Sequence, residues 1–537
     1  MVFYTLQTGN IAGPYLQKNY STIRELIYAL LTFSCRIVDE KVEEDNVSEK
    51  EFNYPVCVLL NQKFQSKDSD IMENITMREL SELLRYRFRY LNIIVELVTP
   101  DLQRQSIPKD LQKRIENIKI YTQSRLLRIK NWICHETPDY IDSMYGYLQN
   151  PTRGTSDKNI EKFIKFLDNV NYQDLLVIPH SNEYYLKKLS TWDFNAYEFS
   201  LDELLQIAYI ILSNSSYTNC LSDNNLFSFL FFIRDNYRIG NPFHNFRHAV
   251  DVLQATNLFL KRLVHKYNIK PIDEYGLLLA SLGHDIGHPG ITNAFFNNQA
   301  LPLAAYFENI SVLEQFHYFQ FEQIRKPYFS FFNEKDNNSI DKLIHSSILA
   351  TDMARHDSFI DKIDNIQNQN QNQHQNQNQN QNEDDNFPLL ASLLIKCADI
   401  SNVCRPLSSS CKWGMSLGEE FRQIACLENS LSKCHVYATT WGKCSCGALS
   451  ASECTSISPL DADTVLGDLG NKIKGKLIKD IEIDESVQLV PGLRGSQMFF
   501  INRFAGSFFE KIGDYIPELK FLSEQVEKNV IYWENKD

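Results

Sequence analysis

Apolar residues recur at helical spacing over most of the chain after Trp192, whereas the earlier part mixes strand-like and helix-like patterns. Residues 54–60 and 91–98 are short runs of valine, isoleucine and leucine, which predicts two buried strands, and residues 77–91 have the spacing of a helix. We therefore predict a small α/β domain over residues 1–105. Its sequence shows no phosphate loop or catalytic cluster, so we expect a regulatory or packing role.

The pattern of the remaining chain predicts a large helical domain. Residues 106–189 are polar and charged and are predicted to form a helical linker. Residues 190–537 carry helical patterns almost without interruption, and Ser200 with Glu203 three residues later forms the pattern of an N-terminal capping box. The predicted fold is therefore mainly all-α, with a multi-helical domain preceded by the small α/β domain.

Two stretches interrupt the helical pattern. The tract Gln367–Asn382 consists of Gln and Asn broken once by His374 and cannot bury enough apolar area to fold alone, so we predict a surface loop over residues 363–386. A second irregular stretch, residues 430–494, contains several cysteines. A zinc knuckle there is an alternative, but the cysteine spacings fit no regular Cys-x2-Cys pairing, which favours a long loop with scattered thiols.

The polar residues with the clearest chemical pattern follow an apolar run at residues 277–283. His284, Asp285 and His288 come directly after this run, and the next two residues are proline and glycine, which cannot continue a helix. We therefore expect these side chains at the edge of the core. If the helix extends that far, His284 and His288 lie one turn apart and converge on one point.

Two further segments place candidate ligands at the polar ends of apolar helices. His244 and His248 lie one turn apart at the predicted start of an amphipathic helix, and we expect them to point the same way. Asp399 follows an apolar run, where a buried carboxylate needs a cation or hydrogen-bond donors. Imidazole and carboxylate groups bind zinc, manganese and magnesium, so the sequence predicts a metal site. Its candidate ligands are His248, His284, Asp285 and Asp399.

Composition and charge limit the classes of partner. The 537 residues carry a net charge of −13, which argues against a nucleic-acid partner because a phosphate backbone needs a basic surface. The apolar run at residues 26–38 is too short and too polar to span a bilayer, so we expect no membrane span. Twelve cysteines in a long chain without a signal sequence indicate reduced thiols. We expect an intracellular, cytoplasmic protein, with presence in the nucleus left open.

Five motifs together carry a family resemblance. They are HNFRHAVDV from His244, GHDIGHPG from residue 283, ATDM from residue 350, KCADISN from residue 396 and SQMFFI from residue 496. Their residues and their order resemble the signature set of the class I cyclic-nucleotide phosphodiesterases. The segments around Trp192 and Glu314 are most similar to the fungal high-affinity cAMP phosphodiesterases. The resemblance covers about residues 190–530.

The resemblance implies hydrolysis of 3′,5′-cyclic AMP to 5′-AMP, which lowers intracellular cAMP signalling. It implies Zn²⁺ on the four candidate ligands and Mg²⁺ or Mn²⁺ at a second site that Asp285 shares, with hydroxide formed from a bridging water as the nucleophile. His244 is then the general acid and Glu420 orients its ring. His288 is expected to hydrogen-bond metal-bound solvent.

The resemblance also implies a pocket for the base. Its residues are Gln497, Phe500, Asn402, Ile400 and Met353. Gln497 resembles the glutamine that hydrogen-bonds the purine, and Phe500 the phenylalanine that stacks on it. Because a terminal amide can donate or accept, Gln497 alone does not select adenine over guanine, and a dual-specificity or cGMP phosphodiesterase stays open.

The sequence departs from the family pattern at two positions. Phe243 stands where many members have tyrosine. Ile310 stands where many members have an acidic residue that binds water at the metal site, with Glu308 as its candidate substitute. The occupancy of the second metal site is therefore left open.

Other classes remain as alternatives at this stage. An HD-type nucleotide phosphohydrolase shares the adjacent His284 and Asp285 but does not need Gln497 with Phe500. A catalytically inactive cyclic-nucleotide sensor would be expected to lose a metal ligand or His244, and all of these residues are present. A zinc peptidase would place a glutamate after the first histidine. The sequence leaves the oligomeric state and regulatory partners unknown.

Overall fold

The structure is a computed structural model of the chain. It describes residues 2–6, 16–38, 56–62, 75–88, 93–98, 157–373 (apart from 216, 218–220, 239 and 265), 387–433, 472–473, 476–490 and 492–535. Residues 106–156 of the predicted linker and the cysteine-rich residues 434–471 lie outside the described residues.

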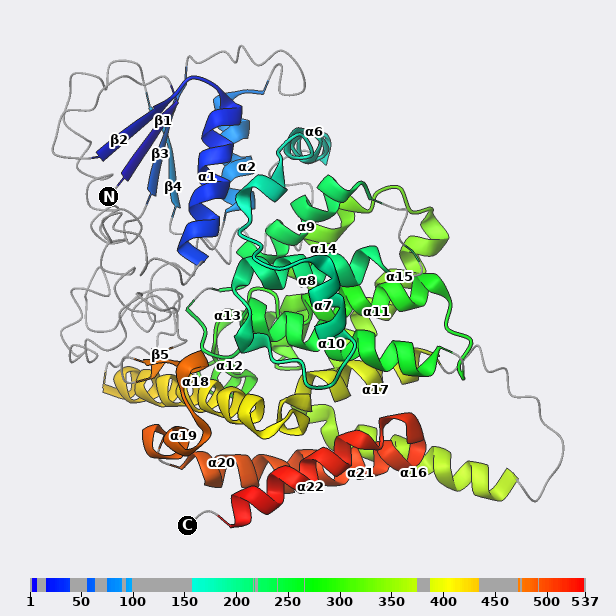
Figure 1. Cartoon of the computed structure of the whole chain (residues 1–537). Coiled ribbons are helices and arrows are strands. Elements are labelled where there is room, and N and C mark those ends of the chain that lie inside the picture. The colour runs from blue at the N-terminus through cyan, green and yellow to red at the C-terminus, as the bar shows by residue number, and fades with distance from the viewer. Residues whose placement is uncertain are drawn as a thin grey trace.

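A four-stranded parallel sheet with the order β2-β1-β3-β4 forms an N-terminal unit with two helices (Figure 1). Its elements are β1 (Val2–Leu6), β2 (Leu16–Tyr20), α1 (Ile23–Val38), β3 (Val56–Asn61), α2 (Met77–Arg87) and β4 (Ile93–Val98). The predicted small α/β domain is thereby confirmed. The sequence pattern does not predict β1 and β2, because strands of five residues gain most of their stability from their neighbours in the sheet.

The remaining described elements form a helical body, which confirms the predicted mainly all-α class (Figure 1). Its first half contains α6 (Asp157–Leu167), η4 (Tyr172–Leu175), α7 (Asn182–Leu189), η5 (Ala196–Glu198), α8 (Leu201–Ser213), α9 (Asp223–Asn236), α10 (Phe246–Leu263), α11 (Pro271–Gly283), α12 (Asn293–Asn298), α13 (Pro302–Tyr306), α14 (Val312–Tyr328), α15 (Glu334–Ala350) and η6 (Met353–Arg355). Its second half contains α16 (His356–Gln373), α17 (Phe387–Asp399), η8 (Ile400–Cys404), α18 (Leu407–Lys433), β5 (Lys472–Ile473), β6 (Lys476–Leu477), η11 (Ile478–Asp480), α19 (Ile483–Leu489), α20 (Leu493–Phe500), the π-helical turn η12 (Ile501–Ala505), α21 (Gly506–Tyr515), η13 (Pro517–Leu519) and α22 (Phe521–Glu534).

Three apolar helices, α10, α11 and α17, form the centre of the helical body. α10 packs against both α11 and α17, and α15 packs against α11 and α17. Leu253, Leu278 and Leu394, one from each central helix, are fully buried. Because these helices are buried on all sides, their polar residues occur at their ends, where the backbone leaves the core.

The capping box predicted at the start of α8 is present. The Ser200 side chain accepts from the Glu203 backbone N–H at 3.2 Å, and the Glu203 carboxylate accepts from the Ser200 backbone N–H at 2.8 Å. Two of the unpaired amides at the helix start are satisfied in this way.

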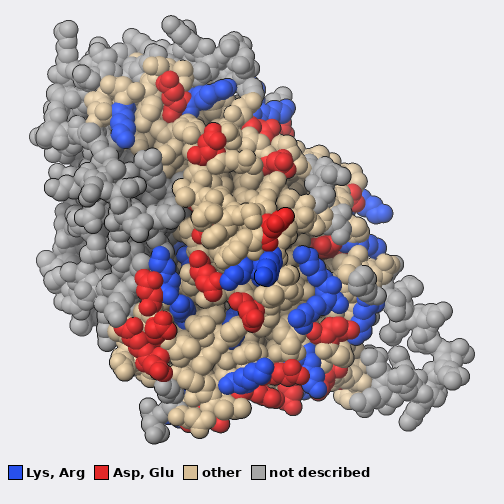
Figure 2. All heavy atoms as spheres, in the orientation of Figure 1, with Lys and Arg blue, Asp and Glu red and all other residues tan. Residues whose placement is uncertain are grey.

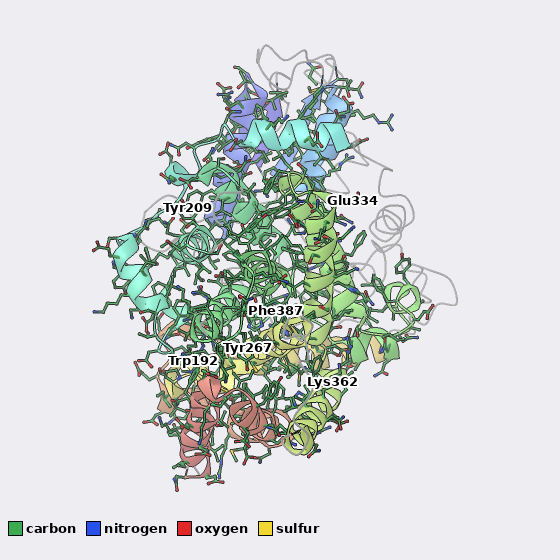
Figure 3. All side chains as sticks on the ribbon, turned by 90° about the vertical axis from the view of Figure 1, so that its right-hand side faces the viewer. Trp192, Tyr209, Tyr267, Glu334, Lys362 and Phe387 are labelled. Atoms are coloured by element: carbon green, nitrogen blue, oxygen red, sulfur yellow. The ribbon has the colours of Figure 1, made fainter. Side chains whose placement is uncertain are left out.

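The C-terminal helices α20, α21 and α22 lie along one side of the body together with α16 (Figure 1). Trp192, labelled in Figure 3, attaches α22 and η8 to this body: its ring stacks on Phe259 of α10 and meets Phe521 of α22 edge-on. Its indole N–H donates to the Cys404 carbonyl at 2.7 Å. This buried aromatic contact joins segments far apart in sequence.

The bounds predicted for the two loops, residues 363–386 and residues 430–494, are wrong. α16 extends through Gln373, so the loop predicted over residues 363–386 begins too early: Ile363 is fully buried, and helical bonding continues into the Gln/Asn tract. The loop predicted over residues 430–494 also contains ordered elements, including α19, whose Ser486 is buried. These elements are stabilised by packing against α18, which the local polar pattern does not reveal.

One described stretch, Phe387–Cys404, is long and apolar enough to cross a membrane, with a mean hydropathy of 1.4. Inside the protein 72% of it is buried, because it forms the central helix α17 and the turn that follows. On the face in Figure 2, the described acidic and basic side chains are interspersed, so that face offers no continuous basic surface to a phosphate backbone.

Candidate metal centre and active site

The ends of the three central helices bring four candidate ligands together. His248 lies in the first turn of α10, His284 caps the C-terminal end of α11 and Asp285 follows it, and Asp399 is the last residue of α17. The start of α10 is fixed by Asn245, whose side chain accepts from the His248 backbone N–H at 3.2 Å. Each ligand therefore sits where an apolar helix meets a polar terminus.

The ligand atoms of these residues converge. His248 Nε2 is 3.1 Å from Asp399 Oδ1 and 3.6 Å from Asp285 Oδ2. His284 Nε2 is 3.1 Å from Asp285 Oδ2 and 3.3 Å from Asp399 Oδ1. The four residues form a group whose ligand atoms lie within 4.8 Å of one another. The structure thus brings together all four residues that the sequence predicted as metal ligands.

The protonation of His284 indicates that this group requires a cation. His284 Nδ1 lies 2.8 Å from the Ser281 carbonyl, which can only accept, so Nδ1 carries a proton and Nε2 is the nitrogen that faces the carboxylates. Nε2 and Asp285 Oδ2 are both buried and make no hydrogen bond. Burial alone would lower the pKa of His284, but Asp285 and Asp399 raise it well above its ordinary value. The same negative charge attracts a divalent cation, so these residues fit a bound metal.

A second group, His244, Glu420 and His288, lies beside the first. Its ligand atoms also lie within 4.8 Å of one another. His244 Nδ1 is 2.5 Å from Glu420 Oε1, and Glu420 Oε2 accepts from the backbone N–H groups of Phe243 at 3.1 Å and His244 at 3.2 Å. Glu420 is almost fully buried on α18. Three donors therefore hold one carboxylate against the His244 ring.

The two histidine rings of this group differ in charge. Burial lowers the pKa of His244, but the adjacent Glu420 carboxylate outweighs that effect and raises it to about 9. Burial and the charge of His244 lower the pKa of His288 well below its ordinary value. His288 Nδ1 accepts from the Gly290 backbone N–H at 2.9 Å, so its proton is on Nε2. The rings stack at 3.9 Å, with His244 cationic and His288 neutral at neutral pH.

Two helical expectations for these histidines are wrong. α10 begins at Phe246, so His244 precedes the helix instead of lying one helical turn before His248, and the two ring centroids are 6.0 Å apart. α11 ends at Gly283, and Gly287 with a φ of 76° turns the chain before His288. Only glycine adopts this left-handed conformation without strain, so a turn rather than a helix positions His288.

The structure adds two residues, Glu314 and His317, that the sequence did not assign to the site. His317 Nε2 lies 3.7 Å from Asp285 Oδ1, and its Nδ1 donates to the Ile286 carbonyl at 2.8 Å. Asp285, His288 and His317 form a third candidate group. Burial and the charge of Asp352 raise the pKa of Glu314 to about 7. The sequence could have revealed these residues through their spacing, because Glu314 and His317 are three residues apart at the start of α14 and therefore share one face of the helix.

The two departures from the family pattern also have structural outcomes. Ile310 is 63% exposed, and Glu308 is exposed with a φ of 54°. Glu308 belongs to none of the candidate metal groups found among the described residues, so its predicted substitution for an acidic water ligand gains no support. Phe243 packs between His244 and His248, with ring centroids at 4.8 Å and 4.6 Å.

The residues predicted for the base pocket lie on packed neighbouring elements. Ile400 and Asn402 are buried on η8, and α18 contacts both η8 and α20, which carries Gln497 and Phe500. Gln497 is 5% exposed, and its Oε1 makes no hydrogen bond. Met353 is partly buried in η6, with its sulfur 3.9 Å from Lys396 Nζ. The grouping of these five side chains around one ligand stays a prediction.

The fold and this site define the class of protein. A helical body whose central helices end in a buried group of two histidines and two aspartates, beside a carboxylate-paired histidine, is that of a metal-dependent phosphohydrolase.

Comparison with known proteins narrows this class to a family. Residues 243–438 match the family described as 3′5′-cyclic nucleotide phosphodiesterase. A similar curated protein is 3′,5′-cyclic-nucleotide phosphodiesterase 2 of Saccharomyces cerevisiae, 29% identical over 484 residues, which are 83% of this chain and 85% of that protein. A crystal structure of yeast caPDE2 is 26% identical with a TM-score of 0.76, covering 99% of each chain. Residues 243–438 are therefore a class I 3′,5′-cyclic nucleotide phosphodiesterase domain.

A mammalian relative matches over a smaller part. The high affinity cAMP-specific and IBMX-insensitive 3′,5′-cyclic phosphodiesterase 8A of Mus musculus is 31% identical over 251 residues, which are 43% of this chain and 30% of that protein.

Proposed function

We propose that this cyclic-nucleotide phosphodiesterase hydrolyses 3′,5′-cyclic AMP to 5′-AMP and thereby lowers cAMP signalling. The observation that carries the proposal is the position of the carboxylate-paired His244 beside the four-ligand group, because ester hydrolysis needs a proton donor next to a site that activates water.

Four side chains would hold the first cation in this proposal: His248, His284, Asp285 and Asp399. Two imidazole nitrogens and two carboxylate oxygens are a suitable ligand set for Zn²⁺, and Mg²⁺ or Mn²⁺ would occupy the neighbouring site that Asp285 shares. Bound divalent cations would supply an activated water at neutral pH and neutralise charge on the phosphate.

His244 would donate the proton to the leaving 3′ oxygen. Its pKa of about 9 keeps the ring protonated at neutral pH. Because Nδ1 is bonded to Glu420, only Nε2 is left to give its proton to substrate. Glu420 orients the ring and stabilises its charge, and the neutral His288 stacked on it would present its Nε2 proton to solvent at the site.

Gln497 is compatible with adenine in the present orientation of its amide. Its buried Oε1 is an acceptor without a hydrogen-bond partner, and the exocyclic amine of adenine is a donor that would satisfy it. The corresponding atom of guanine is an oxygen, which would require the amide to rotate. The mouse relative is named as cAMP-specific, which agrees with the proposed activity on cAMP.

An intracellular, cytoplasmic location is also proposed. Among the described residues, Cys397, Cys404 and Cys411 are buried free cysteines, as expected in a reducing compartment.

Turnover of three substrates by the purified full chain tests the proposed function. The enzyme, supplied with Zn²⁺ and Mg²⁺, is incubated with cAMP, cGMP or bis(p-nitrophenyl) phosphate, and the products are separated by chromatography. We expect 5′-AMP from cAMP, slower conversion of cGMP and no cleavage of the linear diester. Comparable rates on both nucleotides would show dual specificity, and no conversion of either would leave a nucleotide-binding sensor.

A further inference from the structure

A buried aspartate of the helical body, Asp235 of α9, contacts both helices of the N-terminal unit. Arg87 from α2 approaches Asp235 Oδ2 at 2.6 Å, and neither side chain has any exposed area. Ser34 from α1 donates to Asp235 Oδ1 at 2.5 Å. Both helices that cover the sheet therefore contribute a donor to the same carboxylate, and we call Ser34, Arg87 and Asp235 the clasp.

The clasp is balanced in charge and enclosed by aromatic rings. Arg234 lies 3.4 Å from Asp235 and 3.3 Å from Asp202, so two buried arginines face two buried aspartates. The Arg87 guanidinium also lies 4.7 Å from the centre of the Phe232 ring. A charge in such surroundings has no water to replace a lost partner, so removing Arg87 would shift the groups around Asp235.

The chain that follows Asp235 holds the turn of the metal centre. The Asn236 carbonyl accepts from the Gly287 backbone N–H at 3.0 Å, and Arg238 Nε donates to the Gly287 carbonyl at 3.2 Å. Asn241 Nδ2 donates to the His288 carbonyl at 2.7 Å. These three bonds clamp the left-handed turn between Asp285 and His288.

A second contact of the N-terminal unit involves α14, the helix that carries Glu314 and His317 near the metal centre. Tyr86, next to Arg87, donates its hydroxyl hydrogen to the Gln323 carbonyl of α14 at 2.8 Å. The first turn of the same helix carries Glu314, and His317 follows one turn later. Adjacent residues of α2 therefore fix both α9 and α14 relative to the metal centre.

We infer that the clasp is a positioning device for catalysis: Arg87 and Ser34 hold Asp235 so that the chain after it, through Asn236, Arg238 and Asn241, keeps the turn at Gly287 in the geometry that would bind the second divalent cation. The N-terminal unit thus acts on the reaction although it contributes no side chain to the three candidate metal groups of the described residues. This inference rests on the proposed function, because it concerns the same site.

Binding of Mn²⁺ alone tests the inference without depending on activity. Full-length protein, carrying its tightly bound metal, is titrated with Mn²⁺, and free Mn²⁺ is counted by electron paramagnetic resonance. We expect Arg87→Met to weaken Mn²⁺ binding by about tenfold, the size seen when residues supporting metal ligands are removed. Arg87→Lys, which keeps the charge, should restore part of that affinity.

Leu80→Ala is the matched control, because Leu80 is a fully buried residue of the same helix without a polar role. It should lower the melting temperature and leave Mn²⁺ affinity at the wild-type value. Equal Mn²⁺ affinity in Arg87→Met, Leu80→Ala and the parent would overturn the inference.

Ser34→Ala carries the test if Arg87→Met does not fold, since it removes one neutral donor from Asp235. A measurable loss of Mn²⁺ affinity supports the clasp, and an unchanged value rejects it. Cyclic-AMP turnover is measured on the same samples. An inactive parent that still binds Mn²⁺ would defeat the proposed function alone, whereas an active parent with unaffected clasp variants would defeat only the inference.

Discussion

His244 and Asp399 lie in the same site but have different proposed roles, proton donor and metal ligand. Asp399 lies among the candidate ligands with its Oδ1 3.1 Å and 3.3 Å from two imidazole nitrogens, whereas His244 is bonded to Glu420 at 2.5 Å and belongs to a different group. A ligand and a proton donor differ in what their loss does to the metal.

We therefore predict opposite metal contents for two alanine variants. Asp399→Ala should lose the first metal and all turnover. His244→Ala should keep the metal and slow hydrolysis by about two to four orders of magnitude, as for removal of a general acid. Metal analysis with a turnover assay checks both. A His244→Ala protein stripped of zinc would move His244 into the ligand set.

The position of Gln497 depends on a glycine on the facing helix. A Cβ added at Gly414 would lie 2.5 Å from Gln497 Nε2, closer than any normal contact, whereas one at Gly418 would lie 3.7 Å from Val490. Gly414→Ala should therefore displace the amide and raise the KM for cAMP with less effect on kcat. Gly418→Ala, one turn along α18, is the control and should match the parent. An unchanged KM in Gly414→Ala would remove Gln497 from the base pocket.

At the scale of elements, the contact of α16 with the π-helical turn η12 depends on an uncharged histidine. His356 is 1% exposed and donates from Nε2 to the Phe504 carbonyl at 3.1 Å. Burial and the cation of Lys396 lower the pKa of His356 from 6.5 to about 4. The unfolded chain therefore binds a proton first as the pH falls.

Acid should weaken the fold through this residue. The stability that the neutral ring provides is present above pH 6.5 and is lost progressively as the pH falls toward 4. By pH 5 the loss should be about 2 kcal/mol. Urea unfolding at pH 7 and pH 5 measures it, with His356→Gln as a side chain that does not titrate. Equal pH dependence of the variant and the parent would contradict the assignment.

Because α16 extends to Gln373, we expect the part of the Gln/Asn tract after this helix, residues 374–382, to be dispensable for folding. Deleting residues 374–382 should leave Tm and turnover nearly unchanged, because these residues have no apolar side chain and halving a loop alters closure by only about 0.6 kcal/mol. A deletion that starts at Gln367 shortens the helix after the buried Ile363 and should lower Tm. Thermal unfolding of both deletions distinguishes them; equal Tm values would place the loop boundary before Gln367.

At the scale of the whole molecule, the four candidate ligands join three helices. They come from α10, the end of α11 and the end of α17, so a cation bound there connects the centre of the helical body. Without it, Asp285 and Asp399 are two buried carboxylates in one cluster.

Chelation should therefore destabilise the entire fold. A cation present at a hundred times its dissociation constant contributes about 2.7 kcal/mol, so removal by EDTA should lower Tm by several degrees. Adding Zn²⁺ back should restore it. His244→Ala should keep the metal, so its Tm should fall by the same amount on addition of EDTA. A parent protein whose Tm does not change with EDTA would contradict a structural role for the cation.

The sequence alone determined the class of fold and the residues of the metal centre. Apolar helices that end in His248, His284, Asp285 and Asp399 are local patterns, and an apolar run that stops at a ligand already places that ligand at the edge of the core. The parallel sheet was partly predictable for the same reason, through the buried runs that became β3 and β4.

Only the tertiary structure decided which residues meet across the chain. Glu420 reaches His244 over 176 positions and Arg87 reaches Asp235 over 148, separations that no local pattern encodes. The turn at Gly287, rather than a helix, orients His288, and packing against α18 orders α19 within a stretch that looks irregular. The spacing of residues along the sequence shows which side chains lie on one element. Which side chains of different elements come into contact depends on how the core packs.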